Sequence, residues 1–450
     1  MAGQSKTGGS YSVSFSLPKS LNPETDGYIL VNAACVREFD MHFGMNAMPS
    51  GHVTCLVTEL KEIPVSGAYG MMLIQGQDDD KASDISFGVY ISNLMHGQDT
   101  TGSSKITFDF TVGSKESELK QANFACTGTS AAAMKECVKA AGMESLCRYT
   151  GNGKNADSMV WRLVNGNFAE NMNYIVSNSY VPSDLLFWTL DERKGKILIS
   201  TFGTEKSSKV RSMMIYSQDA LVSTTNAEYM PNAMAGTSLY RYQTMSRMDH
   251  TSQWRAAMLP NLTVDTTSSS GVKETGDCGG ECIEVIMNTA GASELPAALK
   301  PPKTGRGVYG EPKLAMAFPM NGHKKYAVAE TIRARLMSEY SRVAKVRIFN
   351  HLGPVVGSCV YLVARNLMFA QGQIAPDADY TARYIVIEKR VTKQTSTSSG
   401  TLGNRRSTMT AEYVTELTLA TNFQYTKNAA KEYGVVIDLM NQVANTLKKG

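Results

Sequence analysis

The sequence predicts a mainly β protein with α+β insertions: two antiparallel β-barrel blocks, a small mixed α/β module and a C-terminal helix. Three observations lead to this prediction. Short apolar runs separated by Gly and Asp fill residues 26–113. Helix-forming residues with apolar positions three or four apart begin at Ser114. A second series of strand-like runs begins near Val343.

Residues 1–25, which are rich in Gly, Ser and Lys, are expected to form a flexible N-terminal arm. In the first barrel, 26–113, the clearest strand is 105–112, where Ile106, Phe108 and Phe110 alternate with polar residues and so share one face. Further strands of this barrel are predicted at 28–36, 53–60, 71–75 and 85–94.

The α/β module is predicted to span residues 114–205. Its helices are expected at 114–124, 130–141 and 165–177. A β-hairpin should follow, with strands at 185–190 and 196–202 and a short polar loop in which Gly195 supplies a positive φ.

Residues 206–325 are expected to form an irregular, mixed domain and a linker, with one strand near 210–216 and a Pro-rich stretch at 296–312. The second barrel is assigned to 326–425. Its predicted strands are 344–348, an apolar strand at 359–364 that should be buried on both sides, and a long pair at 382–390 and 412–419. Residues 426–450 should form the terminal helix, with one apolar stripe.

The two β blocks resemble one another in layout. Each has early strands, an apolar middle strand after a Gly, and then a long strand pair. Residue identity between the blocks is negligible, so an internal duplication is a hypothesis based on layout alone.

Composition narrows the class of function. The chain has 450 residues, and its 45 basic and 41 acidic side chains give a net charge of +4, too small an excess for a protein that coats nucleic acid. No apolar run reaches the roughly 18–20 residues that span a bilayer, and the first residues contain no apolar signal segment. We therefore expect a soluble protein without membrane contact, assembled in a cytoplasm.

The sequence shows no pattern for catalysis or for a cofactor. The six histidines form no metal-binding motif, and neither a nucleophile elbow nor a phosphate-binding loop is present. Among the eight cysteines only Cys278 and Cys282 lie close together; a metal site or a local disulfide is possible there, and free thiols are favoured. We expect no enzyme, no cofactor, and no catalytic, cofactor-binding or metal-binding residues.

Two stretches carry a resemblance to a known family. One lies in the second block, at 341–364, 377–394 and 411–422. Its motif is a strand entry formed by Asp379, Tyr380, Ala382, Arg383, Tyr384 and Ile385. The other is the stretch 173–200, in which a helix leads into a hairpin with Trp188, Asp191, Gly195 and Lys196 in a pattern of large aromatic, Asp, turn and Gly-Lys. In these stretches, and over about half of its length, the chain resembles the baseplate hub (tail hub) proteins of contractile-tailed bacteriophages, which are related to type VI secretion spike proteins.

The resemblance implies two tail-tube-like barrels and a structural role in the virion, at the tail baseplate. It implies a homotrimer whose pseudo-hexameric ring adapts the sixfold tail tube to a threefold central spike and lines the conduit for tape measure protein and DNA. The implied partners are the tail tube protein, the central spike protein, the tape measure protein and baseplate wedge proteins, with DNA only as transiting cargo. The alternatives are a tube or wedge subunit and, further off, a cell-wall hydrolase or a receptor-binding β protein.

Overall fold

The computed structural model describes twenty stretches of the chain. They are residues 11–57, 62–76, 85–98, 102–118, 121–149, 157–179, 181, 184–207, 213–217, 233–234, 237–242, 244–248, 262–265, 282–286, 313–319, 342–349, 352–363, 380, 382–397 and 409–421. The predicted terminal helix at 426–450 and the Pro-rich stretch at 296–312 lie outside these residues, and the predicted domain boundaries stay predictions.

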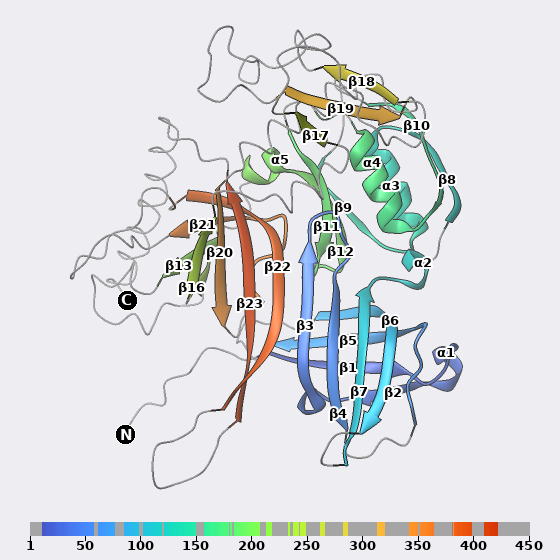
Figure 1. Cartoon of the computed structure of the whole chain (residues 1–450), viewed down its shortest axis with the longest axis vertical. Helices are drawn as coiled ribbons and strands as arrows, with labels where there is room; N and C mark the ends of the chain where they lie inside the picture. Colours follow the sequence, from blue (N-terminus) through green and yellow to red (C-terminus); the bar gives the residue numbers. More distant parts are fainter. Residues whose placement is uncertain are drawn as a thin grey trace, which may run out of the picture.

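The first β block contains seven antiparallel strands in the spatial order β3-β4-β7-β6-β5-β1-β2. Their bounds are β1 (Tyr11–Pro18), β2 (Tyr28–Val31), β3 (Val36–Gly44), β4 (Ser50–Val57), β5 (Ala68–Gly76), β6 (Ile85–Gln98) and β7 (Ser104–Val112), with the short helices α1 (Pro23–Asp26) and η1 (Ala33–Cys35) between them. Strands β1 and β5 cross β3, β4 and β7 at a steep angle (Figure 1), and aromatic rings fill the space between them: Phe15 lies 5.3 Å from Phe108 and 5.7 Å from Phe110.

The expected flexible arm is wrong from Tyr11 onward. Strand β1 pairs with β2 and β5, and Val13, Phe15 and Leu17 are almost completely buried. The sequence alternates apolar residues with Ser over this strand, a period of two that places all its apolar side chains on the core face. The Gly- and Ser-rich composition of the first 25 residues predicts a flexible arm, whereas the period of two from Tyr11 onward is that of a strand.

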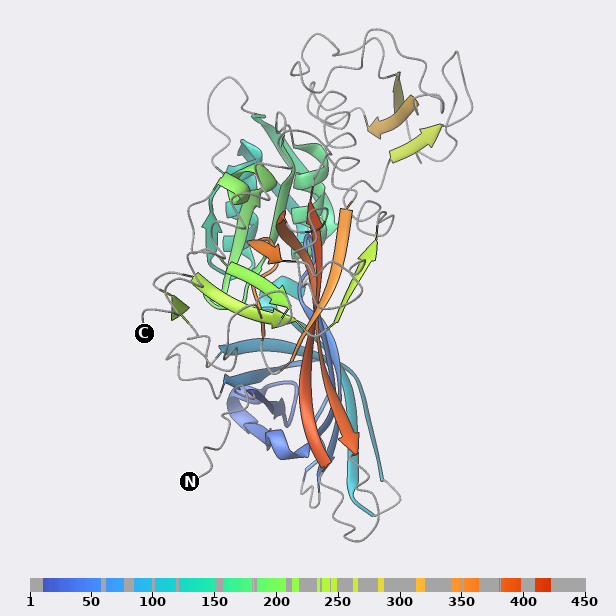
Figure 2. The same ribbon diagram turned by 90° about the vertical axis from the view of Figure 1, so that its left-hand side faces the viewer.

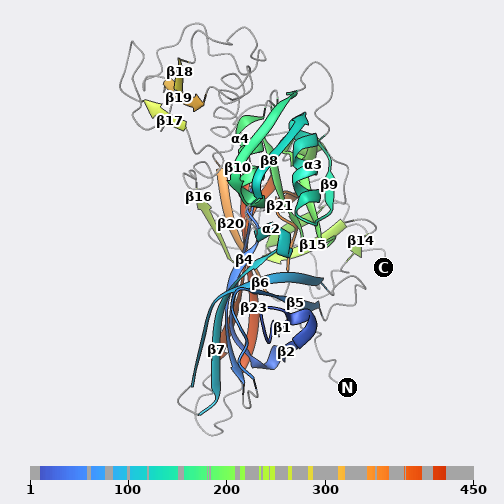
Figure 3. The same cartoon turned by 90° about the vertical axis from the view of Figure 1, so that its right-hand side faces the viewer.

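The module contains strands β8 (Gln121–Gly128), β9 (Ser145–Cys147), β10 (Met159–Gly166), β11 (Leu186–Asp191) and β12 (Lys196–Thr201), and helices α2 (Lys115–Glu118), α3 (Ser130–Ala140), α4 (Phe168–Asn178) and α5 (Phe202–Ser207). The predictions of α3, α4 and the β11–β12 hairpin are confirmed. Asn167 and Glu170 form a capping box at the start of α4, with hydrogen bonds of 2.8 and 2.9 Å. Figure 3 shows this module beyond the first block along the long axis of the molecule.

The helix predicted at 114–124 is wrong. Helix α2 ends at Glu118, and β8 starts at Gln121 as the antiparallel partner of β10. In that pairing Cys126 lies opposite Trp161, whose side chain is fully buried. Pairing with a strand 38 residues later overrides the local helix preference of this segment.

The second β block contains β20 (Arg342–Phe349), β21 (Cys359–Val363), β22 (Ala382–Thr397) and β23 (Met409–Thr421), and the predicted pairing of the last two is confirmed. Four strands from the region expected to be irregular join the same sheet: β13 (Met213–Ser217), β14 (Ala233–Met234), β15 (Thr237–Tyr242) and β16 (Thr244–Met248). Strands β17 (Leu262–Asp265), β18 (Cys282–Ile286) and β19 (Lys313–Pro319) form a separate three-stranded sheet.

Strand β21 is not buried on both sides as predicted. Val360 and Leu362 are fully buried, whereas Cys359 and Tyr361 remain partly exposed. On this partly exposed face, the Arg383 guanidinium lies over the Tyr361 ring, 5.6 Å from the ring centre. An apolar run without polar alternation therefore occurs here on a strand with one half-covered face.

Both blocks belong to one sheet of fifteen strands, antiparallel except where β13 pairs with β15 and β21. In Figures 1 and 2 the strands β22 and β23 run beside β3 and β4 along the long axis. The Tyr11 and Tyr413 rings lie 4.4 Å apart, so β1 of the first block packs directly on β23 of the second. The fold is mainly β, with its apolar core shared between blocks that are far apart in sequence.

Candidate functional site

Strand β22 joins the two blocks. Residues 382–385 pair with β21, and residues 388–392 pair with β3. Because β23 occupies the other edge of β22, these two partners follow one another along the same edge. The register shifts between Val386 and Glu388, at the point where the partner changes. This β-bulge lets the sheet continue from one block into the other without a break.

An ion pair bridges this junction on the outer side of the sheet. The Arg390 guanidinium contacts both carboxylate oxygens of Asp40, with Nε at 2.9 and 3.2 Å and Nη2 at 2.5 Å. This hydrogen bonding to Asp40 raises the pKa of Arg390. The two side chains are 56% and 39% exposed, so the pair specifies the alignment of β3 with β22 more than it adds stability.

Charged side chains continue from this pair across the sheet. His52 lies 2.7 Å from Asp109, and Arg347 donates to Glu416 at 2.9 Å. The cross-strand registers place all these side chains on the same side of the sheet. We call this surface the polar face; it is formed by Asp109, His52, Asp40, Arg390, Glu416 and Arg347. Acidic and basic groups alternate from strand to strand among these six residues, so each carboxylate lies beside a basic side chain.

A second ion pair is buried beneath the junction. Lys389 on β22 is completely buried and its Nζ contacts Glu192, which is 2% exposed and lies in the β11–β12 turn. The Nζ also lies 3.5 Å from the Pro354 carbonyl oxygen and 4.5 Å from the centre of the Phe43 ring. Burial lowers the pKa of Lys389. This one cation therefore touches the first block, the module and the second block.

The hairpin turn also holds the loop that precedes β21. Arg193 donates from Nη2 to the Gly353 carbonyl at 3.1 Å, and the Gly357 amide donates to the Val386 carbonyl at 2.8 Å. Gly357 has φ +85°, and a Cβ on it would lie 2.5 Å from the Phe187 ring. Only glycine lets the backbone approach β11 this closely.

The turn between β3 and β4 is tied to the module by Asn46. The backbone N–H of Asn46 donates to the Trp188 carbonyl at 2.8 Å, and the side-chain Oδ1 of Asn46 accepts from the backbone N–H of Trp188 at 3.1 Å. Asn173 on α4 accepts from Trp188 Nε1 at 2.9 Å and donates to the Asn46 carbonyl at 3.1 Å. The indole N–H of the buried Trp188 and its backbone N–H and carbonyl thus all have partners, and Trp188 connects the first block to the module.

The other residues of the hairpin motif have structural roles. The Asp191 side chain accepts from the Arg193 amide at 3.2 Å, Gly195 has φ +62°, and Lys196 pairs with Glu144 at 2.6 Å. In the strand-entry motif, the Tyr384 hydroxyl donates to the Tyr380 carbonyl at 3.0 Å. Asp379 lies outside the described residues. The sequence resemblance therefore falls on residues that shape the junction.

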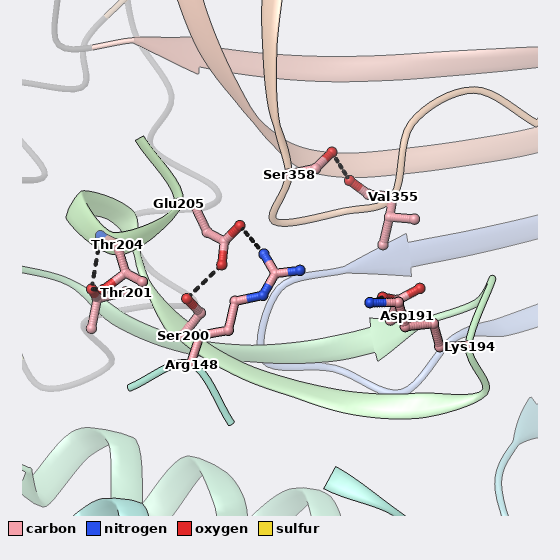
Figure 4. Close-up of polar contacts among 9 residues, drawn as sticks. All are labelled: Arg148, Asp191, Lys194, Ser200, Thr201, Thr204, Glu205, Val355 and Ser358. Atoms are coloured by element: carbon pink, nitrogen blue, oxygen red, sulfur yellow. Dashed lines mark hydrogen bonds and ion pairs between the residues drawn. The ribbon is translucent and has the colours of Figure 1, made fainter. Parts of the chain in front are cut away.

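A buried carboxylate supports the module where it meets β22 (Figure 4). Glu205 on α5 is 3% exposed and accepts from Arg148 Nη1 at 2.5 Å and from Ser200 Oγ at 2.6 Å. These contacts hold α5 against β12, and Phe202 of α5 packs on Phe187 with ring centres 5.6 Å apart. Both oxygens of Glu205 are hydrogen-bonded, which suits a structural carboxylate.

The described residues contain no group of three or more His, Cys, Asp or Glu side chains that would hold a metal ion. Burial raises the pKa of the Cys55 and Cys137 thiols to about 12, which keeps them protonated and unreactive at neutral pH. The side chains of Cys278 and Cys282 lie outside the described residues. Within that same part of the chain, no helix has the length and apolar character needed to cross a membrane.

No protein-family model and no curated protein matches this chain. Among solved structures, a tail protein from Neisseria meningitidis is 11% identical with a TM-score of 0.45, the match covering 92% of this chain and 97% of that one. The 43 kDa tail protein of prophage MuSo2 from Shewanella oneidensis is 8% identical with a TM-score of 0.43, covering 91% and 98%.

A third similar structure is an Escherichia coli component of the type VI secretion system, described as structurally similar to two bacteriophage T4 tail proteins. It is 8% identical with a TM-score of 0.39, covering 87% of this chain and 74% of that one. With TM-scores below 0.5 these likenesses carry no conclusion about function. These three structures are two phage tail proteins and a component of the type VI secretion system, and the sequence resemblance is to tail hub proteins related to type VI secretion spikes.

Proposed function

We propose that this protein is a baseplate hub: a structural virion protein that forms a homotrimeric, pseudo-hexameric ring between a sixfold tail tube and a threefold central spike. One observation carries the proposal. The two blocks have the same strand order, β3-β4-β7-β6-β5 in the first and β16-β20-β23-β22-β21 in the second. Each chain therefore supplies two similar units, a geometry suited to joining partners of sixfold and threefold symmetry.

The correspondence extends to irregular features. Strands β6 and β22 are the long strands of their blocks, with 14 and 16 residues. Each carries a register shift where its first partner ends, between Ser92 and Met95 in β6 and between Val386 and Glu388 in β22. Bulges are specific features of a fold, so their matching positions support the duplication hypothesis.

The polar face fits a surface that lines a conduit. Its acidic and basic side chains are paired with one another, and no large patch of one sign faces outward among its six residues. A surface whose charges are paired attracts a polyanion only weakly. DNA and tape measure protein would pass along such a wall without binding tightly.

The solution mass of the purified protein tests the proposal. Light scattering after size exclusion should give three times the chain mass of 48.9 kDa, and negative-stain images should show a ring of six lobes with an open centre. A closed hexamer with one chain per sixfold unit would instead indicate a tube subunit. A chain that stays monomeric alone and with a trimeric spike would contradict the hub.

A further inference from the structure

Strands β2, β1 and β5 form one side of the first block (Figure 3), and their outer surface is apolar. Of the seven large apolar side chains that are well exposed in the described part of the chain, five lie on or beside this surface, which we call the apolar face: Leu21, Tyr28, Leu30, Ile63 and Met71. The register places Ser16 between Leu30 and Met71, which are 66% and 49% exposed. An apolar patch of this kind marks a surface that another element covers.

Two loops extend the apolar face past the strand ends. Leu21 follows β1 and lies beside Gly67, where a Cβ would be 3.7 Å from the Leu21 Cδ2. Lys19 pairs at 2.7 Å with Glu62, the neighbour of Ile63 in the loop that precedes β5. These contacts hold the two loops together, and they neutralise the charge of Lys19.

Carboxylates border the apolar face. Helix α1, which connects β1 to β2, carries Glu24 and Asp26, and both are exposed. Helix α2 borders the face beyond β5: burial raises the pKa of Tyr69 on β5, and the nearby charges of Glu118 and Glu116 raise it further. A basic segment with an apolar stripe would complement a face with this border.

The chain itself contains such a segment, residues 428–448, which lies outside the described residues. Its apolar positions recur three or four residues apart and form one helical stripe: Ala429, Tyr433, Val436, Met440, Val443 and Leu447. Lysines stand at 427, 431, 448 and 449, and the only acidic residues between them are at 432 and 438.

The length of chain after Thr421 allows this segment to reach the apolar face. Thr421 lies about 26 Å along β23 from Tyr413, whose ring contacts Tyr11 of β1, and the apolar face lies about 17 Å further along β1. Residues 422–427 can extend over about 20 Å, and a helix over 428–448 adds about 30 Å. Because β1 and β23 do not run in one line, the direct distance is shorter than the two steps together.

We infer that residues 428–448 form a helix whose apolar stripe packs on the outer surface of β2, β1 and β5 of the same chain, with its lysines beside the carboxylates of α1 and α2. Leu30 and Met71 are then covered, and the small Ser16 between them leaves room for the side chains of the helix. The inference goes beyond the proposed ring and does not depend on it.

Cysteine cross-linking in the full-length chain tests this packing. Leu30→Cys is combined with Val436→Cys, Met440→Cys or Val443→Cys, which samples two turns of the stripe. After mild oxidation, at least one pair should give a linked peptide from the single-chain band of a non-reducing gel. The matched control is Val160→Cys, an exposed apolar position on β10, which should link with none of the three. Wild type oxidised in parallel reports linkage through native cysteines.

Hydrogen exchange gives a second measurement that needs no cross-link. Amides of residues 428–448 should be protected in the wild type and in Val160→Asp, and should lose most of that protection when Leu30→Asp is combined with Met71→Asp. Unchanged protection in this double variant would overturn the inference, as would links that form only between chains or equally through Val160. A monomeric protein that links within one chain would support the helix packing while contradicting the hub.

Discussion

Lys389 carries a charge into the interior of a β protein, and Glu192 is its counter-ion. Removing one member of such a pair leaves an uncompensated buried charge. We expect Lys389→Met to lower the free energy of unfolding by about 3–5 kcal/mol. In contrast, Arg390→Met on the exposed side of the same strand should cost about 1 kcal/mol or less. Urea denaturation of both variants measures the difference.

The double variant Lys389→Met with Glu192→Leu separates charge from packing. With both charges gone, we expect most of the lost stability to return, because an apolar pair of similar volume replaces the ion pair. A single Lys389→Met no more damaging than Arg390→Met would show that the buried pair is not formed in solution.

Asp109 gives the polar face a pH dependence. Its pKa is lowered, chiefly by the hydrogen bond with His52 and then by the one from Asn93. A carboxyl whose folded pKa is depressed contributes stability above its unfolded value of about 3.9, and that contribution is lost as pH falls through the folded pKa. His52→Ala should therefore be less stable than wild type at pH 6, by at most about 1 kcal/mol because both groups are exposed.

The two proteins should converge once the pH is well below 3.9, since Asp109 is then protonated in both. Thermal unfolding across this range measures the effect, with His96→Ala, another exposed histidine, as the control. A stability difference that persists unchanged in acid would contradict the assignment.

For individual residues, the sequence predicts little of the junction between the two β blocks. The alternation of β7 predicts which of its side chains are buried, and the structure agrees. Lys389 shares the inner, buried face of β22 with Val391. In the sequence, the only sign of its buried ion pair is a charged residue at a position where the strand pattern expects an apolar one. Its counter-ion lies 197 residues earlier in the chain, and no local pattern links the two.

Among the elements, the loop before β21 depends on a close approach to β11. Gly353 and Gly357 both have positive φ, +71° and +85°, but a Cβ on Gly353 would meet only ordinary contacts at 3.6 Å or more. Gly353→Ala and Gly357→Ala should share the backbone strain of about 1 kcal/mol. Gly357→Ala should lose about 1–3 kcal/mol more, because the new methyl group overlaps the Phe187 ring.

Chemical denaturation of the two alanine variants measures this excess. Adding Phe187→Leu to Gly357→Ala should recover part of it by making room for the methyl group. Equal losses for the two alanine variants would mean that the loop does not pack on β11 as described.

Elements with strong local patterns were predictable, and elements defined by distant partners were not. The capping box of α4 and the turn at Gly195 are encoded within a few residues, and both were predicted as helix and hairpin. The residues of β8 have a helical pattern, and they form a strand because they pair with β10. Strand β1 has a plain period of two, but it lies within a Gly- and Ser-rich segment whose composition is typical of a flexible arm.

On the scale of the whole molecule, the two blocks should unfold as one unit. Residues 388–392 pair with β3, and Tyr413 packs on Tyr11 and Phe39, so the core of the first block includes side chains of the second. Native-state hydrogen exchange at rising urea should bring peptides of β4 and β23 onto one unfolding isotherm. Strand β23 exchanging at much lower urea than β4 would mean that the blocks are independent.

The sequence layout predicts two similar blocks, and their strand orders agree with that hypothesis. It does not predict their fusion into one sheet. Fusion depends on β22 having an edge longer than its partner β21, which contains five residues, and on a bulge that no residue pattern announces. The strand predicted near 210–216 is confirmed as β13, but its pairing with β21 is not predictable from a local pattern, because Met214 lies opposite Tyr361. The same holds for β16, where Thr244 lies opposite Arg347.

The partner change in β22 has a mechanical consequence. Strands β22 and β3 lie side by side along the long axis of the molecule (Figure 1), and five residue pairs join them. A pull along that axis loads these hydrogen bonds in shear, so they must rupture together, whereas a pull across the sheet would open them one at a time. The junction is therefore strongest against a pull along the long axis of the molecule.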